Sequence, residues 1–477
     1  MAAEYLTVRN LTSTPLILKH VERFPPAQIA KRDIKRFAKS SKKNEKKSTS
    51  AADTETLRAE PFDRQDVSIC IEPFQSVKSD IRAYDKSDKE QLQLTFDADG
   101  EKHEIKTLAP TKESTTLKPL NENPRFKFTG IYIALESHLA IYSSANLNAW
   151  MRELKDETYL SALSIPGTHN SPTCYVAAPS VRCQAVNPRE QLENGVRFFD
   201  VRVQLQFPND PSKDNLILVH GAFPISFTGH KYFRDVVNEI ESFLERNPSE
   251  ALIMSLKREG PGSHTDAQLS RILRNHYARD GSRWYTEPRV PSLGEVRGKI
   301  VLIRRFGLEE RLAREWNGRG WGINGEGWAN NSPFSTCPSG DICIQDFYEV
   351  LKKEKIQQKI DYVNAHFGRT AELCYPFGVI GKEGANGDGD GGVGNRKLPF
   401  YINFLSASNF WKMETWPEKI AARVNPAAVD YLCRRHQGEK GDWSTGILVC
   451  DWVGLDGDWD LVRCVVGMNT RLMMRQR

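Results

Sequence analysis

Residues 160–171 have the sequence LSALSIPGTHNS, an apolar run that passes into a Gly-Thr turn and ends with His169 beside Asn170. A single loop histidine is more often structural than catalytic, so this segment does not identify a function by itself. It is the first of eight strand-like apolar runs in the C-terminal two-thirds of the chain. The other seven are residues 196–203, 216–223, 252–259, 299–306, 342–349, 400–407 and 446–453.

The eight runs predict an α/β fold, namely an irregular (β/α)8 barrel of the TIM type over residues 147–477. Between the third and fourth runs, residues 230–250 repeat apolar side chains at the spacing of an amphipathic helix. Further helices are predicted after the sixth run, from residue 350, and at 425–436. Residues 204–215 have no helical pattern, so we expect an irregular connection between the second and third runs.

The N-terminal third, residues 1–145, predicts a separate β-rich, sandwich-like accessory domain. Short β-type runs separated by polar turns occur in residues 1–30 and 66–145, without a sustained helical pattern. Between them, residues 31–60 are rich in Lys, Ser and Thr and are expected to form a basic, disordered loop. Nothing in this domain has the pattern of a catalytic site.

The positive charge of the chain is concentrated in one segment. The net charge is +5, but residues 31–47 carry nine Lys or Arg against Asp33 and Glu45, which is +7, so the remainder carries −2. A near-neutral body does not indicate nucleic-acid binding. We interpret the basic segment as a solvated loop, with an electrostatic tether to an anionic membrane or a nuclear-import signal as alternatives.

The composition, 39% hydrophobic and 27% charged, is that of a globular protein. No apolar run approaches the ~20 residues that span a bilayer, and the first residues lack a basic and then apolar signal pattern. The nine cysteines follow neither a CxxC nor a zinc-type spacing, which is typical of reduced thiols. We therefore expect a cytoplasmic protein whose contact with membranes is peripheral.

Polar residues stand at the ends of the apolar runs, where a barrel of this type builds its active site. Each has a structural explanation; Asp200 and Arg202, for example, share one strand face and suit a simple ion pair. Together, however, histidines and carboxylates supply an acid and a base, and the cationic side chains suit an anion such as phosphate. The candidates are His169, Asn170, Asp200, Arg202, His220, Lys257, Arg305, Asp346, Tyr348 and Asp451. Glu259 also stands at the end of the fourth run, beside Lys257.

These runs and their flanks resemble the phosphatidylinositol-specific phospholipases C of the bacterial type, with the look of a fungal, intracellular relative. The resemblance covers residues 150–467 in the family's order and spacing and leaves the N-terminal third outside. It rests on LSIPGTHNS, NGVRFFDVRV, LVHG, FLERNPSEALIMSLKRE, GKIVLIRRF, IQDFYEV, YINFLSAS and GILVCDWV.

The resemblance implies cleavage of phosphatidylinositol, or a related inositol phospholipid, at a membrane surface. The inositol 2-hydroxyl would attack phosphorus and release diacylglycerol and inositol 1,2-cyclic phosphate. His169 would be the general base, oriented by Asp451, and His220 would protonate the leaving oxygen. Arg202 would neutralise charge on the phosphorane oxygens. The inositol ring would be held by Lys257, Arg305, Asp346 and, through stacking, Tyr348.

A metal is not expected in this site. The calcium-dependent branch of the same fold has carboxylates at the positions of Arg202 and Lys257, and two fixed cations repel a divalent ion. We therefore predict a calcium-independent enzyme without a cofactor, in which Arg202 replaces the ion. The Gly- and Asp-rich residues 384–397 are expected to form a surface insertion, since they lack the spaced ligands of a calcium loop.

Asn170 departs from the bacterial pattern, in which a carboxylate follows the first histidine and supports the acid histidine. An amide cannot raise the pKa of His220 by charge, although Asp200 offers a substitute carboxylate. We therefore expect a weaker enzyme or a shifted pH optimum.

Two other functions remain open at this point. The first is a metal-dependent phosphodiesterase acting on a glycerophosphodiester or a sphingolipid, which loses activity in chelator. The second is a catalytically silent barrel that binds phosphoinositides, against which the complete acid and base pair argues. The tryptophans at 321, 328, 411 and 416 lie in loop-like segments and suit either a membrane interface or a core.

Overall fold

The computed structural model describes residues 5–25, 60–83, 90–107, 114–210, 212–375 and 398–476. The chain divides into two compact units, Met1–Ser143 and Ser144–Arg477, close to the boundary expected at 145–147. The predicted loop at 31–60, except its last residue, and the Gly- and Asp-rich residues 384–397 lie outside the described residues.

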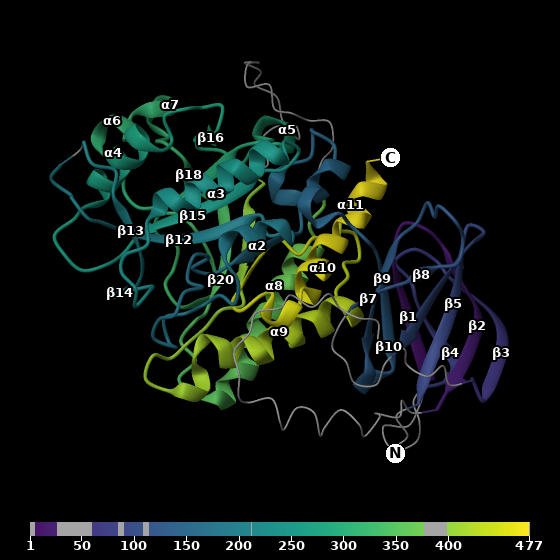
Figure 1. The fold of residues 1–477 in the computed structure, drawn as a ribbon. Coiled ribbons are helices and arrows are strands. Elements are labelled where there is room, and N and C mark those ends of the chain that lie inside the picture. Colours follow the sequence, from purple (N-terminus) through teal and green to yellow (C-terminus); the bar gives the residue numbers. More distant parts are fainter. Residues whose placement is uncertain are drawn as a thin grey trace, which may run out of the picture. The chain divides into compact units, whose positions relative to one another are not determined.

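The N-terminal unit consists of two five-stranded sheets (Figure 1). Its strands are β1 (Tyr5–Leu11), β2 (Leu16–Phe24), β3 (Asp63–Ile71), β4 (Ser76–Arg82), β5 (Gln91–Ala98), β6 (Glu101–Thr107), β7 (Thr115–Thr116), β8 (Lys118–Pro119), β9 (Phe128–Ile133) and β10 (His138–Ser143). One sheet has the order β4-β1-β10-β9-β7, and the other has the order β3-β2-β5-β6-β8. The predicted β-rich, sandwich-like domain is confirmed.

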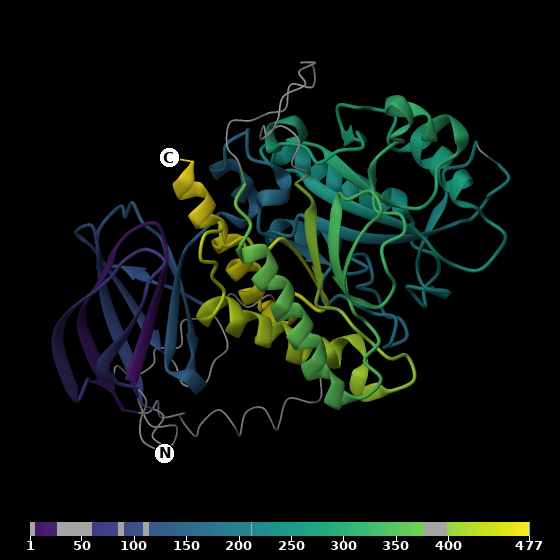
Figure 2. The same cartoon turned by 180° about the vertical axis from the view of Figure 1, so that it is seen from behind.

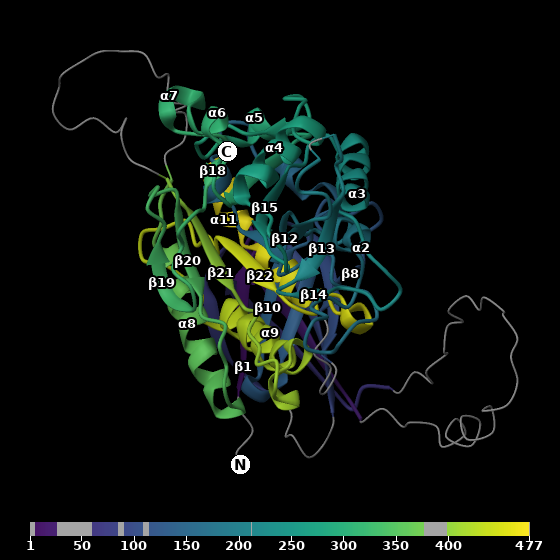
Figure 3. The ribbon, with the colours of Figure 1, turned by 90° about the vertical axis from the view of Figure 1, so that its left-hand side faces the viewer.

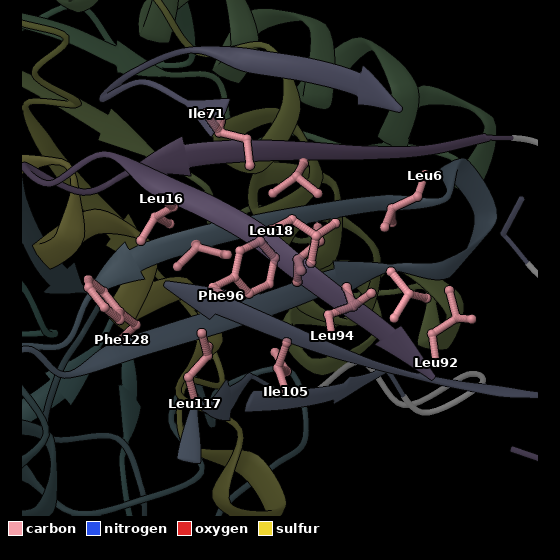
Figure 4. Packing of buried hydrophobic residues seen from close by; sticks show 14 of the residues in the cluster. Leu6, Leu16, Leu18, Ile71, Leu92, Leu94, Phe96, Ile105, Leu117 and Phe128 are labelled. Atoms are coloured by element: carbon pink, nitrogen blue, oxygen red, sulfur yellow. The ribbon is translucent and has the colours of Figure 1, made fainter. Parts of the chain in front are cut away.

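Alternating apolar side chains explain why these strands form a sandwich. Leu92, Leu94 and Phe96 point from β5 into a core that also receives Leu6 from β1 and Leu139 from β10 (Figure 4). Both sheets therefore bury one face against the other. The sequence analysis did not identify β4 and β6, because their segments, SVKSDIR and EKHEIKT, are mostly polar.

The C-terminal unit is built around one curled sheet. Its strands are β11 (Ile165–Thr168), β12 (Phe198–Leu205), β13 (Leu216–His220), β14 (Phe223–Pro224), β15 (Leu252–Arg258), β16 (Trp284–Tyr285), β17 (Ile300–Arg305), β18 (Ile323–Asn324), β19 (Ser332–Thr336), β20 (Ile342–Asp346), β21 (Phe400–Phe404) and β22 (Ile447–Cys450). Parallel pairing runs in the order β17-β15-β12-β11-β22-β21-β20, and β20, β21 and β22 lie side by side in Figure 3. The predicted irregular α/β barrel is confirmed, although no pairing closes the sheet between β18 and β19 among the described strands.

The third predicted run is not a parallel barrel strand, so seven of the eight runs form parallel strands. β13 runs antiparallel to β12, with Leu218 opposite Val203. The connection expected to be irregular, at 204–215, contains no helix in its described residues. β12 is long, and β13 runs back along it. His220, at the end of β13, therefore lies near Asp200 in the middle of β12.

Helices cover the sheet on the outside. They are α2 (Pro188–Glu193), α3 (Phe233–Arg246), α4 (Asp266–His276), α5 (Leu293–Val296), α6 (Glu310–Ala313), α7 (Glu315–Gly318), α8 (Ile356–Ala371), α9 (Pro417–Arg434), α10 (Asp460–Gly467) and α11 (Asn469–Arg475). The amphipathic helix predicted within 230–250 is α3, and α8 follows the sixth run. α9 packs beside α8 (Figure 2) and begins well before residue 425, because Pro417 starts it at a position where proline needs no hydrogen bond.

A buried ion pair joins the N-terminal ends of the barrel strands. Arg197, just before β12, bonds Glu250, just before β15, at 2.9 Å, and both side chains are fully buried. The remaining guanidinium N–H groups donate to backbone carbonyls, including those of Leu192 and Leu147, and the ring of Phe243 lies 4.6 Å away. This pair therefore stabilises the end of the barrel that lies opposite the polar strand ends.

We expect Glu250→Gln to lower the stability of the C-terminal unit by about 3–5 kcal/mol, because it leaves the Arg197 charge buried without a counter-ion. Urea denaturation followed by tryptophan fluorescence measures this loss. The matched control is Glu245→Gln, in an exposed pair with Arg283, where the cost is below about 1 kcal/mol. Equal effects of the two substitutions would contradict this role of the buried pair.

Candidate active site

The tight turn after β11 presents His169 at the carboxyl ends of the parallel strands, which we call the mouth. β11 lies so close to β12 that a Cβ at Gly167 would approach Phe198 to 2.9 Å, so glycine is required there. Asn170, three residues after Gly167, has a φ of +41°, which lies in the left-handed region. Asparagine tolerates this region better than most residues do. The sequence GTHN therefore fits the backbone of this turn.

Two hydrogen bonds determine which nitrogen of His169 carries the proton. Nδ1 lies 2.9 Å from Asp451 Oδ1, and Nε2 lies 2.8 Å from Arg202 Nη2. Carboxylates accept and guanidinium groups donate, so Nδ1 carries the proton and Nε2 presents its lone pair. The ring is held in place by its backbone, whose N–H donates to Cys450 O at 2.9 Å. Such a histidine is poised to accept a proton at Nε2.

The Arg202 guanidinium connects His169 with two carboxylates. It lies 3.2 Å from Asp200 Oδ2 and 3.2 Å from Glu259 Oε1. Lys257 Nζ also donates to Glu259, at 2.9 Å. Burial disfavours the Glu259 anion, but Arg202 and Lys257 outweigh burial and hold the pKa of Glu259 well below its usual range. The mouth therefore contains a neutralised network of fixed charges.

Asp200 is the most deeply buried carboxylate of this network. It accepts from Arg305 Nη1 at 3.3 Å and from the backbone N–H of Asn170 at 3.2 Å, in addition to Arg202. Burial opposes its ionisation, yet Arg202 and Arg305 lower the pKa of Asp200 below its ordinary value. Asp200 is thus a permanent anion that aligns two arginines.

His220 faces His169 across the mouth and is held by a backbone carbonyl instead of a carboxylate. The two rings meet edge to face, with centroids 5.6 Å apart, and His220 Nδ1 donates to Val181 O at 2.8 Å. Burial, followed by the charges of Arg202 and His169, lowers the pKa of His220 to about 3. His220 is therefore neutral at physiological pH, with its Nε2 lone pair unprotonated.

Asn170 does not take the place of the missing carboxylate. Its side-chain amide donates to Val219 O at 3.5 Å, next to His220 but not to the ring. Asp200, the predicted substitute, is engaged by the two arginines. The amide therefore contributes no charge that would raise the pKa of His220.

The remaining predicted residues line the other side of the mouth. Arg305 stacks on Trp328, with its guanidinium carbon 3.5 Å from the ring centroid. Tyr348 donates from its hydroxyl to Asn330 at 2.6 Å, and Asp346 is buried at the end of β20. Burial raises the pKa of Asp346 and also that of Asp451, and nearby cations oppose both shifts. The ten predicted residues thus lie around one mouth, Asp346 and Tyr348 at its edge.

The sequence analysis assigned no role to some residues of the mouth. Glu259 was noted at the end of the fourth run, two residues after Lys257 on the same strand face, but was given no part in the site. Trp328 comes from a glycine-rich connection without any periodicity, and Cys183, whose sulfur lies 3.6 Å from His220 Nδ1, comes from the irregular segment before α2. The Val181 carbonyl is a backbone atom and has no sequence signal.

A second concave feature lies at the opposite end of the strands. A cavity of about 460 Å³ is lined by residues that include Tyr159, Arg289 and Asp341. Tyr159 precedes β11 and Asp341 precedes β20, so this cavity faces the amino ends of the strands, whereas the polar cluster lies at the carboxyl ends. The two predicted histidines and Arg202 are therefore at the mouth and not in this cavity.

The oxygen ligands of the mouth do not fit a calcium ion. Asp200 and Glu259 are the carboxylates nearest Arg202, and both are already bonded to arginine or lysine. A hard divalent cation needs six or more oxygen ligands and would be repelled by these cations.

The barrel is similar in sequence to known proteins. Residues 157–306 match the X domain of phosphatidylinositol-specific phospholipase C. The 1-phosphatidylinositol phosphodiesterase of Listeria monocytogenes is 35% identical over 34% of this chain and 50% of its own length. The enzyme of the same name from Staphylococcus aureus strain Newman is 25% identical over 70% of this chain and 97% of its own length.

A solved structure of the phosphatidylinositol-specific phospholipase C of S. aureus has the same fold. It superposes with a TM-score of 0.51 at 23% identity and covers 68% of this chain and 97% of that chain. The C-terminal unit is thus an α/β barrel. Its sequence is similar to the bacterial 1-phosphatidylinositol phosphodiesterases, and residues 157–306 match the X domain of phosphatidylinositol-specific phospholipase C.

The geometry predicts that His220 stays neutral at the lowest pH at which the protein is folded. Histidine NMR spectra recorded during an acid titration measure this directly. In Asn170→Asp a carboxylate beside Val219 favours the imidazolium form, so we expect the pKa of His220 to rise by about one unit or more. An unchanged His220 titration in this variant would contradict the electrostatic role assigned to position 170.

Proposed function

We infer that this protein cleaves phosphatidylinositol, or a closely related inositol phospholipid, to diacylglycerol and inositol 1,2-cyclic phosphate. The observation that carries the proposal is His169, held between Asp451 and Arg202 with its Nε2 lone pair facing the mouth. The similarity to bacterial enzymes of this class supports the choice of substrate.

The first half of the reaction uses His169 as a base. The inositol 2-hydroxyl transfers its proton to Nε2 while its oxygen forms a bond to phosphorus. Asp451 stabilises the resulting imidazolium at Nδ1. Arg202, freed from Nε2, donates to the phosphoryl oxygens, on which negative charge develops. An internal nucleophile is already positioned, which removes much of the entropic cost of the attack.

The second half requires a proton on His220, because the bond from phosphorus to the diacylglycerol oxygen breaks and that oxygen must be protonated. In the free protein the pKa of His220 is about 3. A bound phosphodiester adds negative charge beside the ring and raises this pKa. Protonation of His220 thus depends on substrate binding. Because Asn170 stands in place of a carboxylate, this protonation is the weak step of the proposed reaction.

The inositol ring is assigned to the side of the mouth formed by Lys257, Arg305, Asp346 and Tyr348. Arg305 is fixed by Asp200 and Trp328, so it offers donors in a defined direction. We propose that no metal takes part, since Arg202 supplies the positive charge at the phosphate. The N-terminal unit is not needed for any of these steps.

Exposed apolar side chains at the mouth suit a lipid surface. Phe227, Trp411 and Met413 are 71%, 86% and 68% exposed. Phe223, shortly after His220, stacks on Phe410, after β21, with centroids 5.0 Å apart. Among the four loop tryptophans, Trp411 fits an interface, whereas Trp321 is a core residue at 1% exposure. The apolar rim consists of Val176, Phe223, Phe227, Phe410, Trp411 and Met413.

The expected cytoplasmic location remains a prediction. All nine cysteines are free thiols, as reduced surroundings require. Among the helices of the described residues, none has the length and apolar character that crossing a bilayer requires.

The proposal is tested with the full chain and vesicles of phosphatidylinositol or phosphatidylcholine. We expect release of diacylglycerol from the inositol lipid alone. His169→Gln removes the base and should abolish release, whereas His276→Gln, in α4 away from the mouth, should retain the wild-type rate. Release from both lipids, or an active His169→Gln variant, would refute the assignment.

The apolar rim predicts how the protein partitions onto membranes. The double variant Phe227→Ala, Trp411→Ala removes two aromatic anchors, each worth about 1.5–3 kcal/mol when fully buried, so vesicle affinity should fall by at least about tenfold. Sedimentation with phosphatidylinositol vesicles measures the change. Met474→Ala removes an exposed apolar residue of α11 and is the control that should bind normally. Equal binding by the wild type and the double variant would show that another surface meets the lipid.

A further inference from the structure

The two histidines of the mouth share their surroundings with a thiol. One ring nitrogen from each of His169 and His220 and the sulfur of Cys183 lie within 4.8 Å of one another. Cys183 is fully buried at the base of this cluster, and its sulfur lies 3.6 Å from His220 Nδ1. The proposed reaction has no use for this thiol.

His169 has the protonation pattern of a metal ligand. It donates from Nδ1 to the Asp451 carboxylate, and metal-bound histidines almost always make such a bond with the nitrogen that does not hold the ion. The nitrogen of His220 beside the Cys183 sulfur is Nδ1, which bonds the Val181 carbonyl at rest. In the other neutral tautomer of His220 the proton is on Nε2, and the Nδ1 lone pair can hold the ion in place of the bond to Val181.

The size of the cluster suits a zinc ion after a small adjustment. Three atoms that are no more than 4.8 Å apart have a common point within about 2.8 Å of each. Zinc bonds to nitrogen and sulfur are about 2.0–2.3 Å long, so each side chain needs to move by no more than about 0.5–0.8 Å. Two nitrogens and one thiolate, with a fourth position open to water, form a tetrahedral set that soft divalent ions prefer.

Metal binding and the resting hydrogen bonds exclude each other at His169. Arg202 Nη2 occupies Nε2 at 2.8 Å, so an ion at that nitrogen must replace the guanidinium. Arg202 keeps Asp200 and Glu259 as partners after this displacement. The Cys183 thiol releases its proton to solvent when its sulfur binds the ion, and this thiolate offsets part of the metal charge.

We propose that His169, Cys183 and His220 form a binding site for Zn²⁺ or a similarly soft divalent ion, and that occupation of this site blocks the base, His169. The site is distinct in chemistry from a calcium site, because its ligands are nitrogen and sulfur. Only the inhibition rests on the proposed function; the binding itself does not.

Binding is tested by calorimetric titration of the full chain with Zn²⁺. We expect one site in the wild type, and an affinity at least about tenfold lower in Cys183→Ser. The matched control is Cys174→Ser, a partly buried thiol of the same segment that is not part of the cluster and should bind as the wild type does. Ca²⁺ and Mg²⁺ should give no heat at this site.

Two further measurements keep the proposal falsifiable if Cys183→Ser folds poorly. His220→Gln should weaken Zn²⁺ binding to a similar extent, and Co²⁺ should give the wild type a thiolate-to-metal absorption band that Cys174→Ser retains. Equal Zn²⁺ affinity in the wild type, Cys183→Ser and His220→Gln, or no binding to the wild type, would overturn the site.

Inhibition is a separate readout. Zn²⁺ should stop release of diacylglycerol by the wild type, and chelator should restore it, while Cys183→Ser should keep its basal rate in the presence of Zn²⁺. A protein that turns over no lipid but binds Zn²⁺ through Cys183 would refute the proposed function and leave the metal site intact. Turnover by the wild type that is insensitive to bound Zn²⁺ would refute the block.

Discussion

The arrangement of the mouth depends on one interaction, the contact of the Arg202 guanidinium with His169 Nε2, Asp200 and Glu259. A cation buried at this depth is stable only when carboxylates surround it, and those carboxylates are in turn stable only because of the cation. The network connects β11, β12 and β15 and leaves His169 as an acceptor. The same charges, together with burial, keep His220 neutral. The proposed acid, base and phosphate cradle are therefore parts of a single electrostatic unit.

This unit divides the mouth into two chemically different halves. On one side, oxygen ligands are neutralised by arginine and lysine, so a hard cation has no place there. On the other side, two imidazoles and a thiol meet, and the Arg202 guanidinium contacts one of the imidazoles. We propose that this site needs no calcium for its chemistry and can nevertheless bind a soft metal. The apolar rim stands at the same end of the strands, as the proposed entry of a lipid head group requires.

Much of this architecture follows from patterns in the sequence. Seven apolar runs became parallel strands, and the polar residues at their ends met at one mouth, because parallel strands align their carboxyl ends. The spacing of apolar residues located α3 within its predicted range. The reversal of β13 was missed, since a five-residue apolar run has no direction in its pattern. Glu259 was noted beside Lys257 but was given no role. The Val181 carbonyl that orients His220 could not be predicted, because the sequence does not show where a backbone atom lies.

The most direct test of this account is phosphorus NMR of the water-soluble product formed from phosphatidylinositol micelles in the presence of excess chelator. The account predicts the resonance of a five-membered cyclic phosphodiester, formed at an undiminished rate without any divalent ion. That result requires both an internal nucleophile and a protein cation at the phosphate. A cyclic product that forms only after calcium is added, or an acyclic inositol phosphate as the first product, would contradict it.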